Sequence, residues 1–272
     1  MSIAVVAARI VEYSSAEPVL NVVPRPSLSL IIPAFNEQGR LGQTLTEVWS
    51  YLSRQSYDFE IIVSDDGSSD DTRLIAESFA NEHPYSRAIS IPHAGKAVAI
   101  RAGMKAARGE VVVFTDADLA TPITYLDAFM KSVREGADVV IGSREGSEAN
   151  RVGEPEYRHI MGRVFNRMVQ FLVLPGIDDT QCGFKAFTRF ACSEICRRTQ
   201  LYASEEIITG ARVTAFDVEM LVIARTMGMK IVEIPVVWTY GSQSKVNPLK
   251  DTLINARDIL TIKWNTIRGS YD

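Results

Sequence analysis

The sequence predicts an α/β fold in which helices cover both faces of a mostly parallel sheet. Short apolar runs alternate with longer segments whose apolar residues recur at helical spacing, an order typical of parallel strands joined by crossover helices. The run 111–114 is apolar throughout, as expected of a buried strand. The 272 residues, 46% of them hydrophobic and 23% charged, suffice for a substantial core and have the composition of a soluble globular enzyme.

The first half of the chain repeats a strand–helix unit. Asp70 or Asp71 is the expected cap of the second helix, Gly109 ends the third and Pro122 begins the fourth. The expected elements are strands at 28–32, 59–63, 88–91, 111–114 and 138–141, and helices at 38–52, 70–81, 95–108 and 122–135.

After Gly142 the pattern changes. The polar segment 143–157 is expected to be a loop, and the residues before position 26 form a tail or an added strand. The remaining expected elements are helices at 157–174, 189–198, 216–227 and 249–267, and strands at 182–187 and 231–234.

Charge and cysteine content exclude several classes of protein. The net charge of −4, from 29 basic and 33 acidic residues, argues against a nucleic-acid partner. Three cysteines without a zinc-ligand spacing or a signal peptide indicate a reducing cytoplasm and buried thiols. No apolar run approaches the ~18 residues that cross a bilayer, so any membrane contact is expected to be peripheral, at the cytoplasmic face.

Two carboxylates, Asp116 and Asp118, follow the predicted strand 111–114 directly. Ligands of open α/β sheets bind at the carboxyl ends of the strands, and carboxylate oxygens are suitable ligands for Mg²⁺ or Mn²⁺. This spacing predicts a metal site facing a phosphate-bearing ligand. A solvated cap at the strand end is the alternative.

Other polar and aromatic side chains follow the first two strands. Phe35, after Pro33, is placed to stack on a nucleobase whose edge Glu37 could contact, although a strand–helix turn with an acidic helix start would look the same. Asp66 is placed to accept a hydrogen bond from a ribose hydroxyl or a base N–H.

A third strand end carries positive charge. Lys96 lies at the start of a helix whose next turn carries Arg101, and the free N–H groups of a helix start, together with these cations, suit a diphosphate. The alternative is a solvated basic helix face.

The segments that contain Phe35, Asp66, Lys96 and the pair Asp116 and Asp118 follow one another along the chain. In that order they resemble the nucleotide-sugar half of family 2 glycosyltransferases, which have the GT-A fold and invert the sugar's configuration. The resemblance covers about 27–245. Motifs of the second half are similar to the polyprenyl-phosphate glycosyltransferases, and most similar to their dolichyl-phosphate β-glucosyltransferase branch. These motifs are Ser143-Arg144, Tyr157-Arg158, Asp179-Thr-Gln-Cys-Gly-Phe-Lys185, Ala215-Phe-Asp-Val-Glu219, Trp238 and Gly241-Ser-Gln-Ser-Lys245.

The resemblance implies roles for particular residues. It divides the chain into a tail (1–25), a nucleotide-sugar-binding half (26–145), an acceptor-binding half of the same domain (146–245) and a terminal amphipathic helix (246–272). The implied groups are Pro33, Phe35, Glu37, Asp66, Lys96, Arg101, Asp116 and Ala117 for the nucleotide; Asp116 and Asp118 for Mg²⁺ or Mn²⁺; Gln181, Asp217 and Glu219 for the donor sugar; Arg144, Arg158 and Lys185 for the acceptor phosphate; and Asp217, Asp118 and Arg144 for catalysis.

The resemblance also implies substrates: a hexose, with glucose from UDP-glucose preferred, and a polyprenyl or dolichyl phosphate at a membrane surface. The mannosyl branch usually has a metal-binding Gln where this chain has Ala120, so the metal is expected to rely on the acidic pair, the diphosphate and water. Asp217 is where the family carries its base, and it also stands where it could cap a helix.

Other functions and contacts stay open at this stage. One alternative is a transferase with a soluble or polysaccharide hydroxyl acceptor, for which Asp217 would be an obligatory base. Another is a nucleotide-binding protein without turnover. Along the helix 157–174, the apolar face of Met161, Phe165, Met168 and Leu172 suits either a lipid surface or packing against the sheet. A homodimer or a membrane-protein partner is also open.

Overall fold

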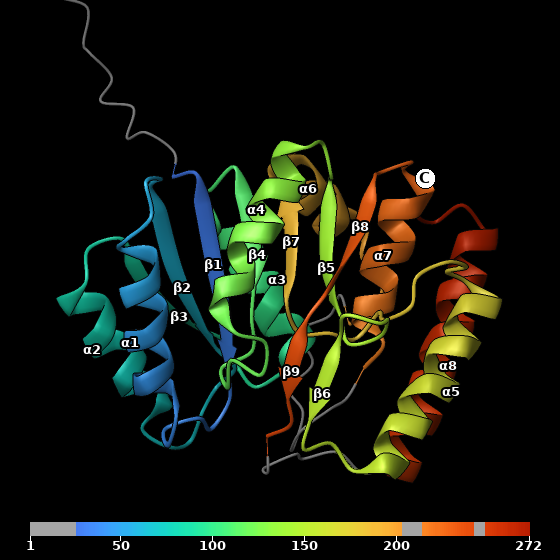
Figure 1. Cartoon of the computed structure of the whole chain (residues 1–272), viewed down its shortest axis with the longest axis horizontal. Helices are drawn as coiled ribbons and strands as arrows, with labels where there is room; N and C mark the ends of the chain where they lie inside the picture. The colour runs from blue at the N-terminus through green and yellow to red at the C-terminus, as the bar shows by residue number, and fades with distance from the viewer. Residues whose placement is uncertain (1–25, 203–213, 242–247) are drawn as a thin grey trace, which may run out of the picture.

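The computed structural model describes residues 26–202, 214–241 and 248–272, with side chains of the last segment described from Ile254 onward. The expected tail at 1–25 and the motif residues 242–245 therefore lie outside the described residues. Figure 1 shows a twisted central sheet with helices on both faces, and two longer helices side by side at one end of the molecule.

The sheet has seven strands in the order β3-β2-β1-β4-β7-β5-β8. β7 runs antiparallel to both of its neighbours, and every other pair in this sheet is parallel. The prediction of a mostly parallel sheet is therefore confirmed. The strands are β1 (Leu28–Ala34), β2 (Phe59–Asp65), β3 (Ser86–Ser90), β4 (Val111–Phe114), β5 (Val139–Ser143), β7 (Lys185–Thr188) and β8 (Ile231–Pro235).

Two apolar clusters lie on opposite faces of this sheet. In β1, Ile31 belongs to one cluster and Leu30 and Ile32 to the other, because successive side chains of a strand point to opposite faces. Helices α3, α6 and α7 contribute to the first cluster, and α1 and α4 to the second. The helices are α1 (Leu41–Leu52), α2 (Thr72–Glu82), α3 (Lys96–Ala106), α4 (Leu126–Arg134), α5 (Glu156–Leu172), α6 (Arg189–Arg198), α7 (Phe216–Thr226) and α8 (Pro248–Ile267), with a 3₁₀ turn at Ile123–Tyr125 before α4.

One expected loop is partly a strand. Within 143–157, β6 (Asn150–Val152) pairs in parallel with β9 (Val237–Thr239) to form a separate two-stranded sheet. The prediction of a loop was wrong there because β6 has no apolar pattern and its outer residues are exposed, so the strand is held by backbone pairing that composition does not reveal.

Helices α5 and α8 pack beside one another, and the Lys263 ammonium donates to the Leu172 carbonyl oxygen at 2.9 Å (Figure 1). The face of α5 that contains Phe165, Met168 and Leu172 packs against the core. Of the two interpretations that the sequence left open for this face, packing against the protein is observed for these three residues, whereas Met161, the fourth, is 38% exposed. The exposed apolar residues of the two helices are Tyr157, Ile160, Met161, Val164, Phe171, Leu260, Trp264 and Ile267.

Candidate active site

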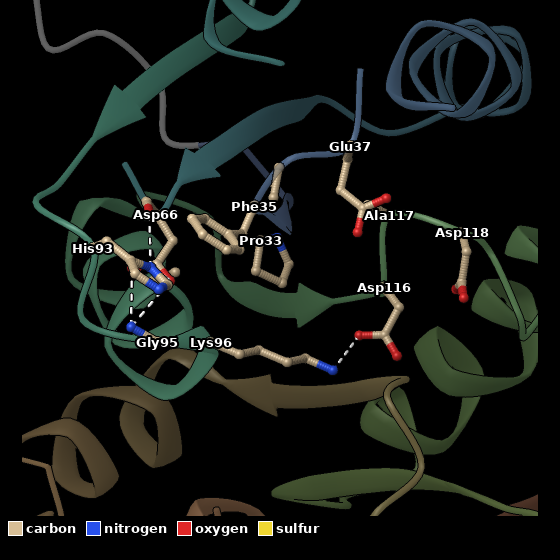
Figure 2. Close-up of a pocket in the computed structure, with 12 residues that line it drawn as sticks. Pro33, Phe35, Glu37, Asp66, His93, Gly95, Lys96, Asp116, Ala117 and Asp118 are labelled. Atoms are coloured by element: carbon tan, nitrogen blue, oxygen red, sulfur yellow. Dashed lines mark hydrogen bonds and ion pairs between the residues drawn. The ribbon is translucent and has the colours of Figure 1, made fainter. Parts of the chain in front are cut away.

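The carboxyl ends of β1, β2 and β4 and the start of α3 surround one cavity of about 270 Å³ (Figure 2). These segments meet because parallel strands end at the same edge of the sheet. Seven of the eight residues expected to bind the nucleotide line the cavity, namely Pro33, Phe35, Glu37, Asp66, Lys96, Asp116 and Ala117. The eighth, Arg101, is buried further along α3.

The carboxylate of Asp66 organises the turn that precedes α3. It is 2% exposed, and it accepts hydrogen bonds from the backbone N–H groups of Ala94 and Gly95 and from Nδ1 of His93, at 2.8 to 3.1 Å. Gly95 has a φ of 101°, a conformation that glycine adopts without strain. The sequence predicted that Asp66 accepts a hydrogen bond from a ribose hydroxyl or a base N–H. In the structure its carboxylate oxygens accept from the turn that leads into Lys96.

Phe35 stacks on His93 at the edge of the same cavity. Their ring centroids lie 3.9 Å apart and the ring planes are within 2° of parallel. Sequence reasoning did not include His93 among the site residues, because it appeared only as the residue before a helix start. The stacking of His93 on Phe35, the residue that follows β1, depends on the tertiary fold, and a single sequence carries no signal for it.

Lys96 extends from the start of α3 to Asp116 at the end of β4 (Figure 2). Its ammonium lies 2.5 Å from Oδ1 of Asp116. Burial would lower the pKa of Lys96, but the carboxylates of Asp116, Asp217 and Asp118 outweigh burial and raise it. Lys96 is therefore a cation at neutral pH, held in the cavity beside Asp116.

Asp118 lines this cavity and also a second, adjoining one of about 610 Å³. Its Oδ1 accepts from the Ala120 N–H at 3.1 Å, and Arg40 lies 3.8 Å from its Oδ2. Burial and the neighbouring Asp116 raise the pKa of Asp118. Two carboxylates that repel each other in a partly desolvated cavity are a donor set that a divalent cation would stabilise.

A metal at this site would have few protein ligands. No group of three or more His, Cys, Asp or Glu side chains able to hold a metal gathers in the described parts of the chain. Ala120 is buried and provides no ligand atom on its side chain. The two residues that fit a metal are Asp116 and Asp118, and the diphosphate and water would have to complete its coordination.

A buried ion pair joins two residues of the second half. Nζ of Lys185 lies 2.6 Å from Oδ1 of Asp217 and 2.5 Å from the carbonyl oxygen of Cys182. Lys185 is 0% exposed and Asp217 8% exposed. The acceptor-phosphate role of Lys185 stays a prediction, and it would require this ammonium to leave its present partners.

Arg144 is held by a buried carboxylate. Its guanidinium donates to both oxygens of Asp179, at 2.6 and 2.9 Å, and it lies over the ring of Trp238 at 5.3 Å. Asp179 also accepts from the Gln181 N–H at 3.1 Å. Sequence reasoning named Asp179 only as part of a motif, and its role as the partner that orients Arg144 appears only in the fold.

The last two candidates lie in different surroundings. Arg158 donates to the hydroxyl of Tyr240 at 2.6 Å, beside the two-stranded sheet. Glu219 is 0% exposed and accepts from the backbone of Leu201 and from the hydroxyl of Tyr271. Its donor-sugar role remains a prediction, and its observed contacts connect α7 to the C-terminal segment.

Comparison with known families settles the class of the protein. Residues 29–196 match the family described as glycosyl transferase family 2. The chain belongs to that family. The residues matched include β1 from Ser29 onward, β2 to β4 and every residue that lines the first cavity, so this family 2 glycosyltransferase has its candidate nucleotide site inside the shared region.

Curated relatives align over most of this family 2 glycosyltransferase. The dolichyl-phosphate beta-glucosyltransferase of Homo sapiens is 33% identical over 263 residues, which cover 91% of this chain and 78% of that protein. The Trichomonas vaginalis protein ALG5A, of the same description, is 36% identical over 233 residues, or 81% of this chain and 68% of that one. The predicted resemblance to this branch is confirmed.

Solved structures of glycosyltransferases share the fold. Glucosyl-3-phosphoglycerate synthase from Mycobacterium tuberculosis, in complex with Mn²⁺, UDP and glucosyl-3-phosphoglycerate, superposes with a TM-score of 0.60 at 18% identity, covering 89% of this chain and 79% of that one. A mannosyltransferase from Pyrobaculum calidifontis, in complex with GDP-Man and Mn²⁺, gives 0.57 at 21% identity, covering 90% and 65%. The GT-A fold expected from the sequence is confirmed.

Proposed function

We propose that the chain transfers glucose from UDP-glucose to a polyprenyl or dolichyl phosphate, with inversion and with a divalent metal. The observation that carries this proposal is the cavity in which the Asp116 and Asp118 carboxylates, the Lys96 ammonium and the Phe35–His93 stack lie together. The dolichyl-phosphate beta-glucosyltransferases that align along most of the chain support the choice of sugar and acceptor.

The donor nucleotide would bind in this cavity. Phe35 and His93 offer an aromatic edge for the base, and Lys96 offers positive charge for the diphosphate. Asp116 and Asp118 would hold Mg²⁺ or Mn²⁺, which supplies positive charge that stabilises a leaving diphosphate. Lys96 pairs with Asp116, one of the two carboxylates that would hold the metal, so the lysine and the metal would both supply positive charge for the diphosphate.

The acceptor phosphate would attack the anomeric carbon from the side opposite the diphosphate. A monoalkyl phosphate has a second pKa of about 6, by analogy with phosphoserine, so its oxygen is already an anionic nucleophile at neutral pH. Asp217 would then orient sugar hydroxyls rather than remove a proton. Its ion pair with Lys185 favours this role, because Oδ1 of Asp217 already accepts a hydrogen bond from a buried ammonium at 2.6 Å.

Arginines would receive the acceptor phosphate. The fork of Arg144 is fixed by Asp179 and by Trp238, and Arg158 is fixed by Tyr240. Planar guanidinium groups with restrained orientation suit phosphate oxygens. Gln181, whose backbone is tied to Asp179, remains a candidate for the donor sugar.

The acceptor's lipid tail would lie along a membrane surface. None of the helices in 26–202, 214–241 and 248–272 is long and apolar enough to cross a bilayer. On α5, Ile160 is 63% exposed and Phe171 88% exposed, and on α8 Trp264 is 52% exposed. We propose that these two helices rest on the cytoplasmic face of a membrane, because amphipathic helices bury such side chains at the lipid boundary.

One assay tests this function. The protein is incubated with UDP-glucose or GDP-mannose and Mg²⁺ or Mn²⁺, with a short polyprenyl phosphate or the matching unphosphorylated polyprenol, and both lipid-linked sugar and free nucleotide are measured. We expect glucosyl lipid only with UDP-glucose, a metal and the phosphorylated lipid. Transfer to the unphosphorylated polyprenol would contradict the acceptor assignment, and nucleotide binding without turnover would contradict the proposal as a whole.

A further inference from the structure

Gly183 lies directly against the carboxylate of Asp116. In the antiparallel pair of β4 and β7, Phe114 faces Lys185, and the same register two residues further on brings Asp116 opposite Gly183. A Cβ atom on Gly183 would overlap Oδ2 of Asp116 and would stand 2.5 Å from its Cγ. Carbon atoms that are not bonded keep about 3.5 Å or more apart, so no side chain fits at position 183 while Asp116 keeps its present position.

Backbone conformation is not the reason for a glycine here. Gly183 is not among the glycines with positive φ, so its backbone is open to an alanine. The conflict is between a new Cβ and one particular side chain. That side chain belongs to the pair proposed above to hold the metal.

The chain on the Gly183 side cannot easily move away. The carbonyl oxygen of Cys182 accepts from buried Lys185, and the carbonyl oxygen of Phe184 accepts from the Gly142 N–H at 2.9 Å. The thiol of Cys182 is packed so closely that a Cβ on Gly142 would lie 2.8 Å from its sulfur. The peptide that leads into Gly183 and the carbonyl group of the next residue, Phe184, are therefore both anchored in the core.

The backbone and the carboxylate of Asp116 are also held in place by hydrogen bonds and an ion pair. Its backbone carbonyl oxygen accepts from the Leu119 N–H at 3.1 Å, and its Oδ1 is paired with Lys96. The movement of least cost is a rotation of the Asp116 carboxylate, which would separate it from Lys96 and change its position relative to Asp118.

We propose that Gly183 is a positioning residue: the missing side chain is what lets Asp116 present its carboxylate to Lys96 and to a divalent cation. This rests on the metal role assigned to Asp116 under the proposed function. Lys185 then acts at two points, because it binds Asp217 and also fixes the peptide that leads into Gly183.

The first test measures binding rather than activity. Mn²⁺ binding, in the presence of UDP, is measured by calorimetry for the native protein, Gly183→Ala and a control, Gly42→Ala. A Cβ on Gly42 in α1 would meet only Ile75 within 4 Å, at an ordinary 3.9 Å. We expect Gly183→Ala to weaken Mn²⁺ binding by about 10- to 100-fold, the usual effect of disturbing a residue that orients a metal ligand, and Gly42→Ala to leave it unchanged. Equal Mn²⁺ affinity in the two variants would overturn the proposal.

The second test separates the contact from general misfolding. Thermal unfolding is compared for Gly183→Ala in the native background and in an Asp116→Ala background, where the overlapping carboxylate is gone. We expect Gly183→Ala to lower the Tm of the native protein and to have little effect when Asp116 is already alanine. An equal loss of Tm in both backgrounds would overturn the contact. A native chain that binds no Mn²⁺ would instead contradict the proposed metal, and the Tm comparison would still decide whether Gly183 positions Asp116.

Discussion

The ammonium of Lys185 and the carboxylate of Asp217 form an ion pair of 2.6 Å in which Lys185 has no exposed surface. The two residues come from β7 and from the first turn of α7, so the pair joins the antiparallel strand of the sheet to the helix that carries the family's candidate base. We expect the loss of the Lys185 ammonium to lower stability, and the loss of the Asp217 charge to have only a modest effect on turnover.

Lys185→Met is expected to destabilise the protein. It leaves the buried carboxylate of Asp217 without its ion-pair partner, and losing one member of a buried pair costs about 3–5 kcal/mol. Urea unfolding measures the effect. Lys131→Met is the control, because Lys131 is exposed and lies 3.8 Å from Glu135 on the surface of α4. Unchanged stability of Lys185→Met would mean that this ion pair contributes nothing to the fold.

Asp217→Asn is expected to slow transfer by about tenfold or less. Asparagine keeps an oxygen for Lys185, and an ionised phosphate acceptor needs no base, whereas loss of a true general base costs about 10²–10⁴-fold. Steady-state transfer to a short polyprenyl phosphate measures the change in kcat. A fall of about 10²-fold or more would make Asp217 an obligatory base and would favour a hydroxyl acceptor.

Asp118→Ala is expected to abolish transfer while the protein stays folded. The substitution removes one of the two carboxylates assigned to the metal and also relieves the repulsion from Asp116 that raises the pKa of Asp118. Glu77→Ala is the control, since Glu77 lies on α2 in a surface pair with Arg73. Turnover of Asp118→Ala at the native rate, with Mg²⁺ or Mn²⁺ present, would rule out the metal assignment.

Lys96→Met is expected to lower kcat by about 10²–10³-fold, the range seen when one group that stabilises developing negative charge is removed. It should also weaken UDP binding. Lys105→Met on the same helix α3 is the matched control, because Lys105 is exposed at the far end of the helix. Equal kcat values for the two variants would exclude Lys96 from stabilising the leaving diphosphate.

Stability should fall in acid partly because of Asp179. Burial would raise the pKa of Asp179, but the charge and hydrogen bonds of Arg144 hold it well below the usual range. A depressed carboxyl pKa stabilises the fold above the unfolded pKa of about 3.9, and this contribution is lost as the pH falls toward the folded pKa. Urea unfolding between about pH 3 and pH 7 should therefore show a steeper acid loss of unfolding free energy for the native protein than for Asp179→Asn. Parallel curves would contradict this assignment.

Local patterns predicted most of the fold. The apolar runs at 28–32, 59–63 and 111–114 became β1, β2 and β4, and the residues after them line one cavity, because parallel strands with helical crossovers must end at a common edge. The pairing of β6 with β9 was missed, as was the stack of Phe35 on His93. Each of these contacts joins segments far apart in the chain, and neither leaves a periodic signal in the sequence.

The surroundings of Asp116 show which features the sequence determines and which depend on the tertiary structure. The sequence by itself determined that Asp116 and Asp118 follow a buried strand and that Lys96 begins a helix, because spacing and polarity are local properties. Only the tertiary structure decided that Lys96 reaches Asp116, that β7 runs antiparallel beside β4, and that Gly183 therefore faces the Asp116 carboxylate. Strand direction and register depend on how distant segments pack, and that packing sets which side chains share the site.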